Sequence, residues 1–142
     1  MIKIIITEDN LISQKALIEK LDDYNDLSLV KVCNNGQEAV DFLAQNQTVD
    51  LILMDIEMPI LNGIEATKIL KSQYPNLKIV MITIYDDDEN IFNAIKSGAD
   101  SYLLKDASSD KIYETIRETL SGGAVMSPSI ALKTLKLLRN PL

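Results

Sequence analysis

The sequence contains no histidine and a single cysteine, Cys33. Without histidine, the chain can form neither a Cys/His zinc site nor a Ser-His-Asp hydrolase site, and one cysteine cannot make an internal disulfide. Cys33 ends the apolar run LSLVKVC, so we interpret it as a small buried hydrophobic residue. These absences exclude the commonest thiolate-metal and hydrolase chemistries.

Long apolar runs and an excess of basic charge are missing as well. No apolar stretch approaches the roughly 20 residues that a membrane-spanning helix needs, and the N-terminal MIKIIIT is too short for the core of a signal peptide. The net charge is −7, whereas nucleic-acid binding normally requires a basic face. We therefore expect a cytoplasmic protein, with no membrane contact and no direct nucleic-acid binding by this segment.

Short runs rich in isoleucine, valine and leucine alternate with longer amphipathic stretches. This alternation is typical of βα units around a parallel sheet, and the nearly continuous apolar runs suit strands that helices cover on both faces. A length of 142 residues fits one such α/β domain. We predict five strands, at residues 2–7, 27–33, 51–54, 78–84 and 101–104.

Five helices are predicted between and after these strands. Asn62 is expected to cap the third helix and Gly98 to end the fourth. We interpret the acidic residues 86–89 as the start of the fourth helix, where they complement its dipole, rather than as a metal site. The expected packing positions are Ile12, Ala16, Leu17 and Leu21 in the first helix, residues 39–43 in the second, residues 64–70 in the third, Ile91, Ala94 and Ile95 in the fourth, and Ile112, Ile116 and Leu120 in the fifth.

A sixth helix is predicted after the break at Gly122-Gly123. Ser127 followed by Pro128 is typical of a capped helix start. Because five βα units do not need this helix, we interpret it as a linker or docking helix. The predicted division is a core domain at residues 1–122 and a linker with a C-terminal helix at residues 123–142. The apolar positions of this helix are Ile130, Leu132, Leu135 and Leu138.

Polar residues end the predicted strands at the edge where sheets of this type bind ligands. In open doubly wound sheets, ligands bind beyond the carboxyl ends of the strands. If the strand order is 2-1-3-4-5, the carboxylates that follow the first and third strands meet in one pocket. The residues at this edge are Glu8 and Asp9 after the first strand, Asp55 after the third, Thr83 at the end of the fourth and Lys105 after the fifth.

Three carboxylates in one pocket require a cation. Two of them about 4 Å apart repel by roughly 4 kcal/mol at an effective dielectric near 20. Their hard oxygens favour Mg²⁺, or Mn²⁺, over zinc. Lys105 could hold phosphoryl oxygens and the Thr83 hydroxyl could donate to another. Each residue alone also fits an ordinary structural role, but the matched set predicts phosphoryl transfer to a carboxylate nucleophile.

These motifs together resemble response regulator receiver domains. The resemblance rests on Glu8-Asp9, LILMDIEMPILNG around Asp55, MITIYDDDE around Thr83 and SGADSYLLKD around Lys105. It implies a flavodoxin-like, doubly wound five-stranded parallel sheet of order 2-1-3-4-5, the order for which a chemotaxis receiver is a standard example. Five helices and the extra C-terminal helix would surround this sheet.

The resemblance also implies a chemical role for the acidic residues. Asp55 would accept the phosphoryl group from a phosphohistidine on a sensor histidine kinase, or from a small donor such as acetyl phosphate. Asp9, Asp55 and the backbone carbonyl of Glu57 would bind Mg²⁺, and Glu8 would help to hold it. The chain would catalyse only its own phosphorylation and dephosphorylation, so it is not expected to be an enzyme in the usual sense.

A conformational switch is the second implication of the resemblance. The phosphorylated aspartate carries roughly 1.5 to 2 more negative charges at neutral pH. Thr83 and Lys105 would be drawn toward it, and Tyr102 would turn inward into the space that Thr83 leaves. The altered face around the fourth and fifth helices would carry the signal, and a phosphorylation-dependent homodimer is one expected readout.

The segment GGAVMSPSIALKTL is similar to the part that follows the receiver in nitrate-response, or LuxR-type, transcription regulators. In those proteins a linker leads to a helix-turn-helix output domain, which this sequence lacks. We therefore expect that the chain is a fragment of a transcription regulator or that it never had an output domain. Its output would then be the control of transcription.

Two departures from the receiver pattern affect the expectations. Ile84 stands where many receivers have a small residue and Tyr85 follows it, so both could crowd the approach to Asp55 and slow spontaneous dephosphorylation. Lys105 is followed by Asp106 where many receivers have proline, so the usual cis peptide bond is not expected. The resemblance therefore does not predict the conformation of the loop after Lys105.

Three other functions share some of these features. A haloacid-dehalogenase-type phosphatase also uses an aspartate nucleophile and Mg²⁺, but it needs a second aspartate where this chain has Glu57. A flavodoxin-like nucleotide-binding module needs a glycine-rich or hydroxyl-rich phosphate loop after the first strand, where this chain is acidic. A degenerate receiver that binds partners without phosphorylation is the third, and the complete set of site residues argues against it.

Overall fold

Five short apolar runs form one parallel sheet in the computed structural model, which describes residues 1–140. The sheet order is β2-β1-β3-β4-β5, which confirms the predicted topology. The fourth strand ends at Thr83, one residue earlier than predicted, because Ile84 turns outward and is exposed. The strands are β1 (Ile2–Thr7), β2 (Leu27–Cys33), β3 (Leu51–Met54), β4 (Lys78–Thr83) and β5 (Ser101–Leu104).

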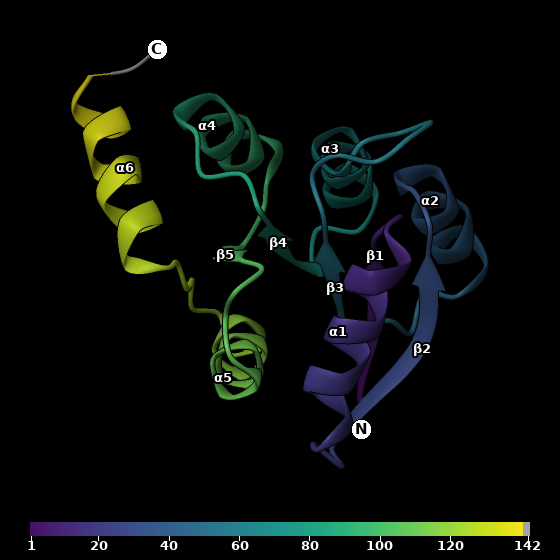
Figure 1. The fold of residues 1–142 in the computed structure, drawn as a ribbon. Coiled ribbons are helices and arrows are strands. Elements are labelled where there is room, and N and C mark those ends of the chain that lie inside the picture. The colour runs from purple at the N-terminus through teal and green to yellow at the C-terminus, as the bar shows by residue number, and fades with distance from the viewer. Residues whose placement is uncertain (141–142) are drawn as a thin grey trace.

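Helices cover both faces of this sheet (Figure 1). Along β1, Ile4 and Ile6 pack in the layer beneath α1 and α5, whereas Ile5 packs in the layer beneath α2, α3 and α4. This alternation explains why the strands are apolar on both sides. The helices are α1 (Leu11–Asp22), α2 (Gly36–Gln45), α3 (Gly63–Gln73), α4 (Asp88–Ser97), α5 (Ser109–Leu120) and α6 (Pro128–Arg139).

Side-chain caps fix where the helices begin at the functional edge. Asn10 and Asn62 accept hydrogen bonds from backbone N–H groups in the first turns of α1 and α3. Asp87 caps α4 in the same way, which confirms that the acidic residues 86–89 start this helix. Gly98 ends α4 in the left-handed conformation, with φ of 109°, as predicted.

The packing face of α1 differs from the prediction. Leu17 and Leu21 are buried, but Ile12 is 80% exposed and Ala16 also faces solvent. Ile12 lies in the first turn of α1, beyond the end of the strands, so it has no sheet surface to pack on. An apolar residue at the predicted spacing was therefore assigned wrongly to the core.

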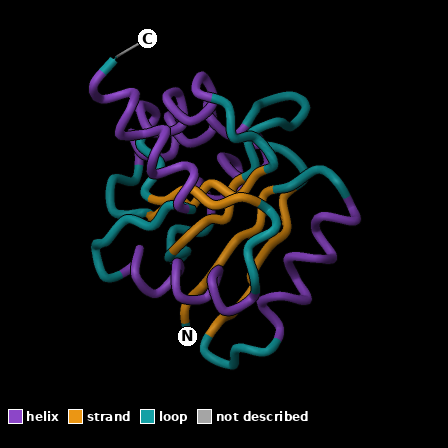
Figure 2. Tube along the Cα trace, turned by 60° about the vertical axis from the view of Figure 1, so that its left-hand side comes forward, coloured by secondary structure: helices purple, strands orange, loops and turns teal. Residues whose placement is uncertain are grey.

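The C-terminal segment packs on the edge of the same body. Met126 forms an isolated parallel bridge with Tyr102, and α6 lies against α4. Figure 2 shows the helix nearest the C-terminus, α6, outside the sheet and next to other helices. Ser127 is the cap residue but its side chain makes no capping hydrogen bond. Ile130 is buried, while the predicted positions Leu132, Leu135 and Leu138 are exposed.

No helix within residues 1–140 combines the length and the hydropathy that crossing a membrane requires.

Candidate functional site

Backbone hydrogen bonds extend past the strand ends and fix the residues that follow them. The N–H of Asp55 donates to the carbonyl of Thr7 at 3.0 Å, and the N–H of Glu8 donates to the carbonyl of Cys33 at 2.9 Å. The N–H of Lys105 donates to the carbonyl of Thr83 at 2.9 Å. The polar residues after β1, β3 and β5 are therefore held on one edge of the sheet by the sheet itself.

Three carboxylates meet at this edge. Glu8, Asp9 and Asp55 each offer an oxygen, and these oxygens lie within 4.8 Å of one another. Glu8 and Asp55 are buried, whereas Asp9 is exposed. Two of the carboxylates therefore lie in the protein interior, and the cluster is accessible to solvent at Asp9. Hard oxygen ligands at this separation, reachable from solvent, fit Mg²⁺ or Mn²⁺.

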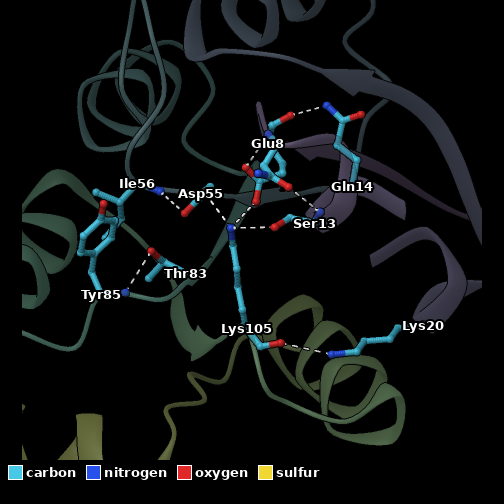
Figure 3. Close-up of polar contacts among 10 residues, drawn as sticks. Glu8, Ser13, Gln14, Lys20, Asp55, Ile56, Thr83, Tyr85 and Lys105 are labelled. Carbon is cyan, nitrogen blue, oxygen red and sulfur yellow. Dashed lines mark hydrogen bonds and ion pairs between the residues drawn. The ribbon is translucent and has the colours of Figure 1, made fainter. Parts of the chain in front are cut away.

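Lys105, the first residue after β5, faces the cluster (Figure 3). Its Nζ donates to Asp55 Oδ2 at 3.0 Å and to Glu8 Oε1, and it lies 3.4 Å from Ser13 Oγ. Partial burial by itself would lower the pKa of Lys105, but the hydrogen bonds and charges of Glu8 and Asp55 outweigh it and raise the pKa. Lys105 is therefore a fixed positive charge beside the buried carboxylates.

The second oxygen of Asp55 also has a donor. Its Oδ1 accepts the backbone N–H of Ile56 at 2.8 Å. Gly63, the first residue of α3, lies directly against the carbonyl of Asp55: a Cβ at this position would come within 1.7 Å of that oxygen. The first turn of α3 thus packs against the backbone of Asp55, and this close contact requires a residue without a Cβ at position 63.

Thr83 and Tyr85 lie beside Asp55 on β4 and its following loop (Figure 3). Thr83 is fully buried, and its Oγ1 accepts the backbone N–H of Tyr85 at 3.3 Å. Burial raises the pKa of Tyr85, as do the nearby charges of Glu57 and Asp55. Ile84, by contrast, is 68% exposed, whereas Tyr85 lies beside Thr83 and Asp55 (Figure 3), so Tyr85 is the better placed of the two residues expected to crowd the site.

Tyr102 is already inside the protein in this structure. It is 1% exposed, and its hydroxyl donates to the carbonyl of Tyr85 at 2.6 Å. Burial raises its pKa further above the usual range. In this conformation Tyr102 is packed against the β4–α4 loop, and its expected movement into the space beside Thr83 on phosphorylation stays a prediction.

Glu57 lies two residues after Asp55 and its side chain is exposed. The acidic cluster is built from the side chains of Glu8, Asp9 and Asp55, and Glu57 is not part of it. A role for Glu57 would come through its backbone carbonyl. That role stays a prediction.

Three residues at the site were not found from the sequence. Gln14 donates its side-chain N–H to the carbonyl of Glu8 at 2.5 Å and to Asn34 Oδ1 at 2.8 Å. Ser13 lies near Lys105 Nζ, and Lys20 contacts the backbone of the β5–α5 loop. All three residues lie on α1: Gln14 follows Ser13, and Lys20 is seven residues after Ser13. The sequence does not say which face of α1 turns toward the site.

The comparison with known protein families fits this geometry. Residues 4–117 match the response regulator receiver domain. The chain therefore belongs to this family, whose members are the signalling domains of two-component response regulators. Receiver domains bind Mg²⁺ at an acidic pocket, and the cluster of Glu8, Asp9 and Asp55 is such a pocket. Family membership rules against the phosphatase and nucleotide-module alternatives.

Two of the relatives with similar sequences are transcriptional regulatory proteins. The chain is 40% identical over 135 residues to the transcriptional regulatory protein LnrK of Bacillus subtilis and 33% identical to DegU of Brevibacillus brevis. Both alignments include 95% of this chain but only 61% of LnrK and 57% of DegU. The chain therefore spans about three fifths of the length of these relatives. The predicted resemblance to receivers of transcription regulators is confirmed.

Solved structures show the same fold. The response regulator domain of Thermotoga maritima CheB is 26% identical, with a TM-score of 0.76 over 85% of this chain and 97% of that one. A LuxR-family two-component response regulator from Aurantimonas is 22% identical, with a TM-score of 0.88 over 97% of this chain and 98% of that one. The second match extends beyond the five βα units and includes the C-terminal segment.

Proposed function

We propose that this receiver domain accepts a phosphoryl group on Asp55. One observation carries the proposal: Lys105 Nζ lies 3.0 Å from Asp55 Oδ2 at the place where Glu8 and Asp9 also bring their carboxylates. A nucleophile, a fixed cation and a set of metal ligands are the parts that phosphoryl transfer needs.

The transfer would form one bond and break one. A carboxylate oxygen of Asp55 attacks the phosphorus of a phosphohistidine, the P–N bond breaks, and its electron pair stays on the leaving imidazole nitrogen. Lys105 is placed to hold an oxygen of the transferring group and to offset its charge. The backbone N–H of Ile56 holds the other Asp55 oxygen and so fixes the direction of attack.

Glu8, Asp9 and Asp55 would hold Mg²⁺, with Mn²⁺ as a substitute, and the backbone carbonyl of Glu57 would complete the set. When bound, the ion supplies charge neutralisation for the carboxylates and for the phosphoryl oxygens. The buried Glu8 is suited to anchor the site, because its other oxygen is held by the N–H of Asn10 at 3.1 Å.

Phosphorylation would act on the rest of the fold through Thr83. The Thr83 hydroxyl accepts the N–H of Tyr85 in this structure and could turn to donate to the phosphoryl group. Such a turn would loosen the loop to which Tyr102 donates. The β4–α4 loop is therefore the element that would report the state of Asp55.

The partners follow from the family. We propose a sensor histidine kinase as the phosphoryl donor, a cytoplasmic location, and control of transcription as the output, because relatives such as LnrK are named transcriptional regulatory proteins. The acidic net charge argues against direct DNA contact by this segment. A phosphorylation-dependent homodimer is proposed, and size-exclusion chromatography with and without beryllofluoride would test it.

Mass spectrometry of the intact chain tests the proposal. After incubation with acetyl phosphate and Mg²⁺, the parent chain should gain one phosphoryl group and the Asp55→Asn variant none. A parent chain that gains none from acetyl phosphate or from a histidine kinase would be a degenerate receiver that only binds partners.

A further inference from the structure

Lys105 is held at three points, and two of the contacts come from α1. Its backbone N–H is fixed by the carbonyl of Thr83 at 2.9 Å. Its backbone carbonyl accepts a hydrogen bond from Lys20 Nζ at 3.1 Å, and its own Nζ lies 3.4 Å from Ser13 Oγ. Both peptide groups that flank the Lys105 Cα are therefore fixed, and the tip of its side chain meets the same helix.

Lys20 joins two carbonyls of the β5–α5 loop. Its Nζ donates to the carbonyl of Ala107 at 2.8 Å as well as to that of Lys105. Within residues 1–140 these two carbonyls accept no other protein hydrogen bond. An ammonium group has three donors, and hydrogen bonds from a charged donor are stronger than neutral ones. The contact therefore ties a short loop to a helix more than eighty residues earlier in the chain.

The spacing on α1 fits this arrangement. Ser13 and Lys20 are seven residues apart, so they lie on one face of the helix and about 10.5 Å apart along its axis. This separation allows one helix to meet Lys105 at both ends, with Ser13 at the ammonium and Lys20 at the backbone. Leu17 lies between them and is buried, which anchors this face of α1 to the sheet.

Apart from the contacts with Lys20, the loop between Lys105 and Ser108 has few polar contacts, although Ala107 packs against the apolar core. It contains no proline, Asp106 is exposed, and its one internal backbone hydrogen bond joins the N–H of Ala107 to the carbonyl of Leu104. Without Lys20, rotation of the peptide group after Lys105 would cost little, and the Lys105 side chain would lose its direction. Figure 3 shows Lys20 reaching the backbone of Lys105 from the side opposite Asp55.

We propose that Lys20 is a positioning residue, which fixes the β5–α5 loop so that the Lys105 side chain points at Asp55. This inference rests on the proposed phosphoryl transfer, in which Lys105 holds the transferring group. Lys20 itself touches no reacting atom. It acts through the two loop carbonyls.

Three variants test the proposal. Lys20→Met keeps the aliphatic stem and removes the donors, Lys20→Arg keeps a charged group that can donate to two carbonyls, and Lys15→Met removes an exposed lysine of the same helix as a control. In Lys20→Met the rate of phosphorylation by acetyl phosphate should fall about tenfold, a loss typical of a small displacement of a catalytic group. Lys20→Arg should recover most of this loss, and Lys15→Met should show none.

A second measurement does not depend on phosphorylation. In ¹H–¹⁵N spectra of lysine ammonium groups, the Lys105 signal, assigned by its disappearance in Lys105→Arg, should be protected by its carboxylate partners in the parent chain. It should lose most of its intensity in Lys20→Met and keep it in Lys15→Met. An unchanged Lys105 signal in Lys20→Met would overturn the proposal, as would equal losses of rate in Lys20→Met and Lys20→Arg. If the parent chain takes up no phosphoryl group, the proposed function fails and the spectra alone decide the role of Lys20.

Discussion

Lys105 Nζ and Asp55 Oδ2 lie 3.0 Å apart, although fifty residues separate them in the chain. The same ammonium group also bonds to the buried Glu8. Lys105 therefore compensates two carboxylates that the fold has removed from most of the solvent, and it competes for them with any bound cation. This double role leads to two opposite expectations for its removal.

Replacing Lys105 with methionine should slow phosphorylation but strengthen metal binding. The rate of phosphoryl uptake from acetyl phosphate should fall about 100-fold, which is typical for the loss of one charge-stabilising donor. The affinity for Mg²⁺, measured by calorimetry, should rise because Glu8 and Asp55 lose their competing partner. Lys15→Met is the matched control, since Lys15 is exposed. Weaker Mg²⁺ binding in Lys105→Met would mean that Lys105 does not share these carboxylates with the metal.

Gly63→Ala should damage both the fold and the site. The added Cβ would lie 1.7 Å from the carbonyl oxygen of Asp55, so α3 and the β3–α3 loop must move apart. We expect the free energy of unfolding to fall by roughly 1–3 kcal/mol, as for other overpacked positions, and phosphorylation of the folded fraction to slow. Gly122→Ala is a useful comparison, because nothing lies within 4 Å of a Cβ there, although its φ of 95° adds backbone strain. Urea denaturation measures the first effect, and equal phosphorylation rates in Gly63→Ala and the parent would contradict the second.

Tyr85→Ala should shorten the lifetime of the phosphoaspartate. Tyr85 faces the site beside Thr83, and the charges of Glu57 and Asp55 act on its hydroxyl, so its ring is placed to limit the approach of water. Ile84→Ala should have less effect, because Ile84 is largely exposed. The loss of phosphoryl group over time, followed by mass spectrometry, measures both lifetimes. A lifetime that does not change in Tyr85→Ala would count against this role of Tyr85.

Tyr113→Phe should cost most stability near neutral pH. The Tyr113 hydroxyl donates to Asp26 at 2.6 Å; this bond lowers the pKa of Asp26 from 3.8 and raises that of Tyr113 from 10.0. The Asp26 contribution exists above the unfolded pKa and is lost as the pH falls through the folded one. The Tyr113 contribution exists below its unfolded pKa and is lost as the pH rises through the folded one.

The difference in unfolding free energy between the parent and Tyr113→Phe should therefore shrink below about pH 4 and above about pH 10. Phenylalanine keeps the ring that stacks on Tyr24 at 4.1 Å, so the variant isolates the hydroxyl. Urea denaturation across this pH range gives the difference. A difference that is constant with pH would show that the bond between Tyr113 and Asp26 does not form in solution.

The resemblance to receiver domains implied the sheet order, whereas the edge with Glu8, Asp9, Asp55 and Lys105 could be predicted from the polar residues that end the apolar runs. An apolar run that stops at an acidic residue places that residue at the sheet edge whatever its neighbours do. The rest depends on contacts between elements far apart in sequence. Nothing in the sequence near Lys20 indicates the loop carbonyls that it meets, and the exposure of Ile12 depends on where the sheet surface ends beneath α1.

The most direct test of the account is to identify the residue that carries the phosphoryl group. Borohydride reduces an acyl phosphate to an alcohol, so a phosphorylated aspartate becomes homoserine, which peptide mass spectrometry can locate. After treatment with acetyl phosphate and Mg²⁺, we predict homoserine at position 55 in the peptide that contains LILMDIEMP. Homoserine at Asp9 or at another aspartate in place of Asp55, or the longer alcohol that reduction of a phosphorylated glutamate such as Glu8 gives, would contradict the site described for this receiver domain.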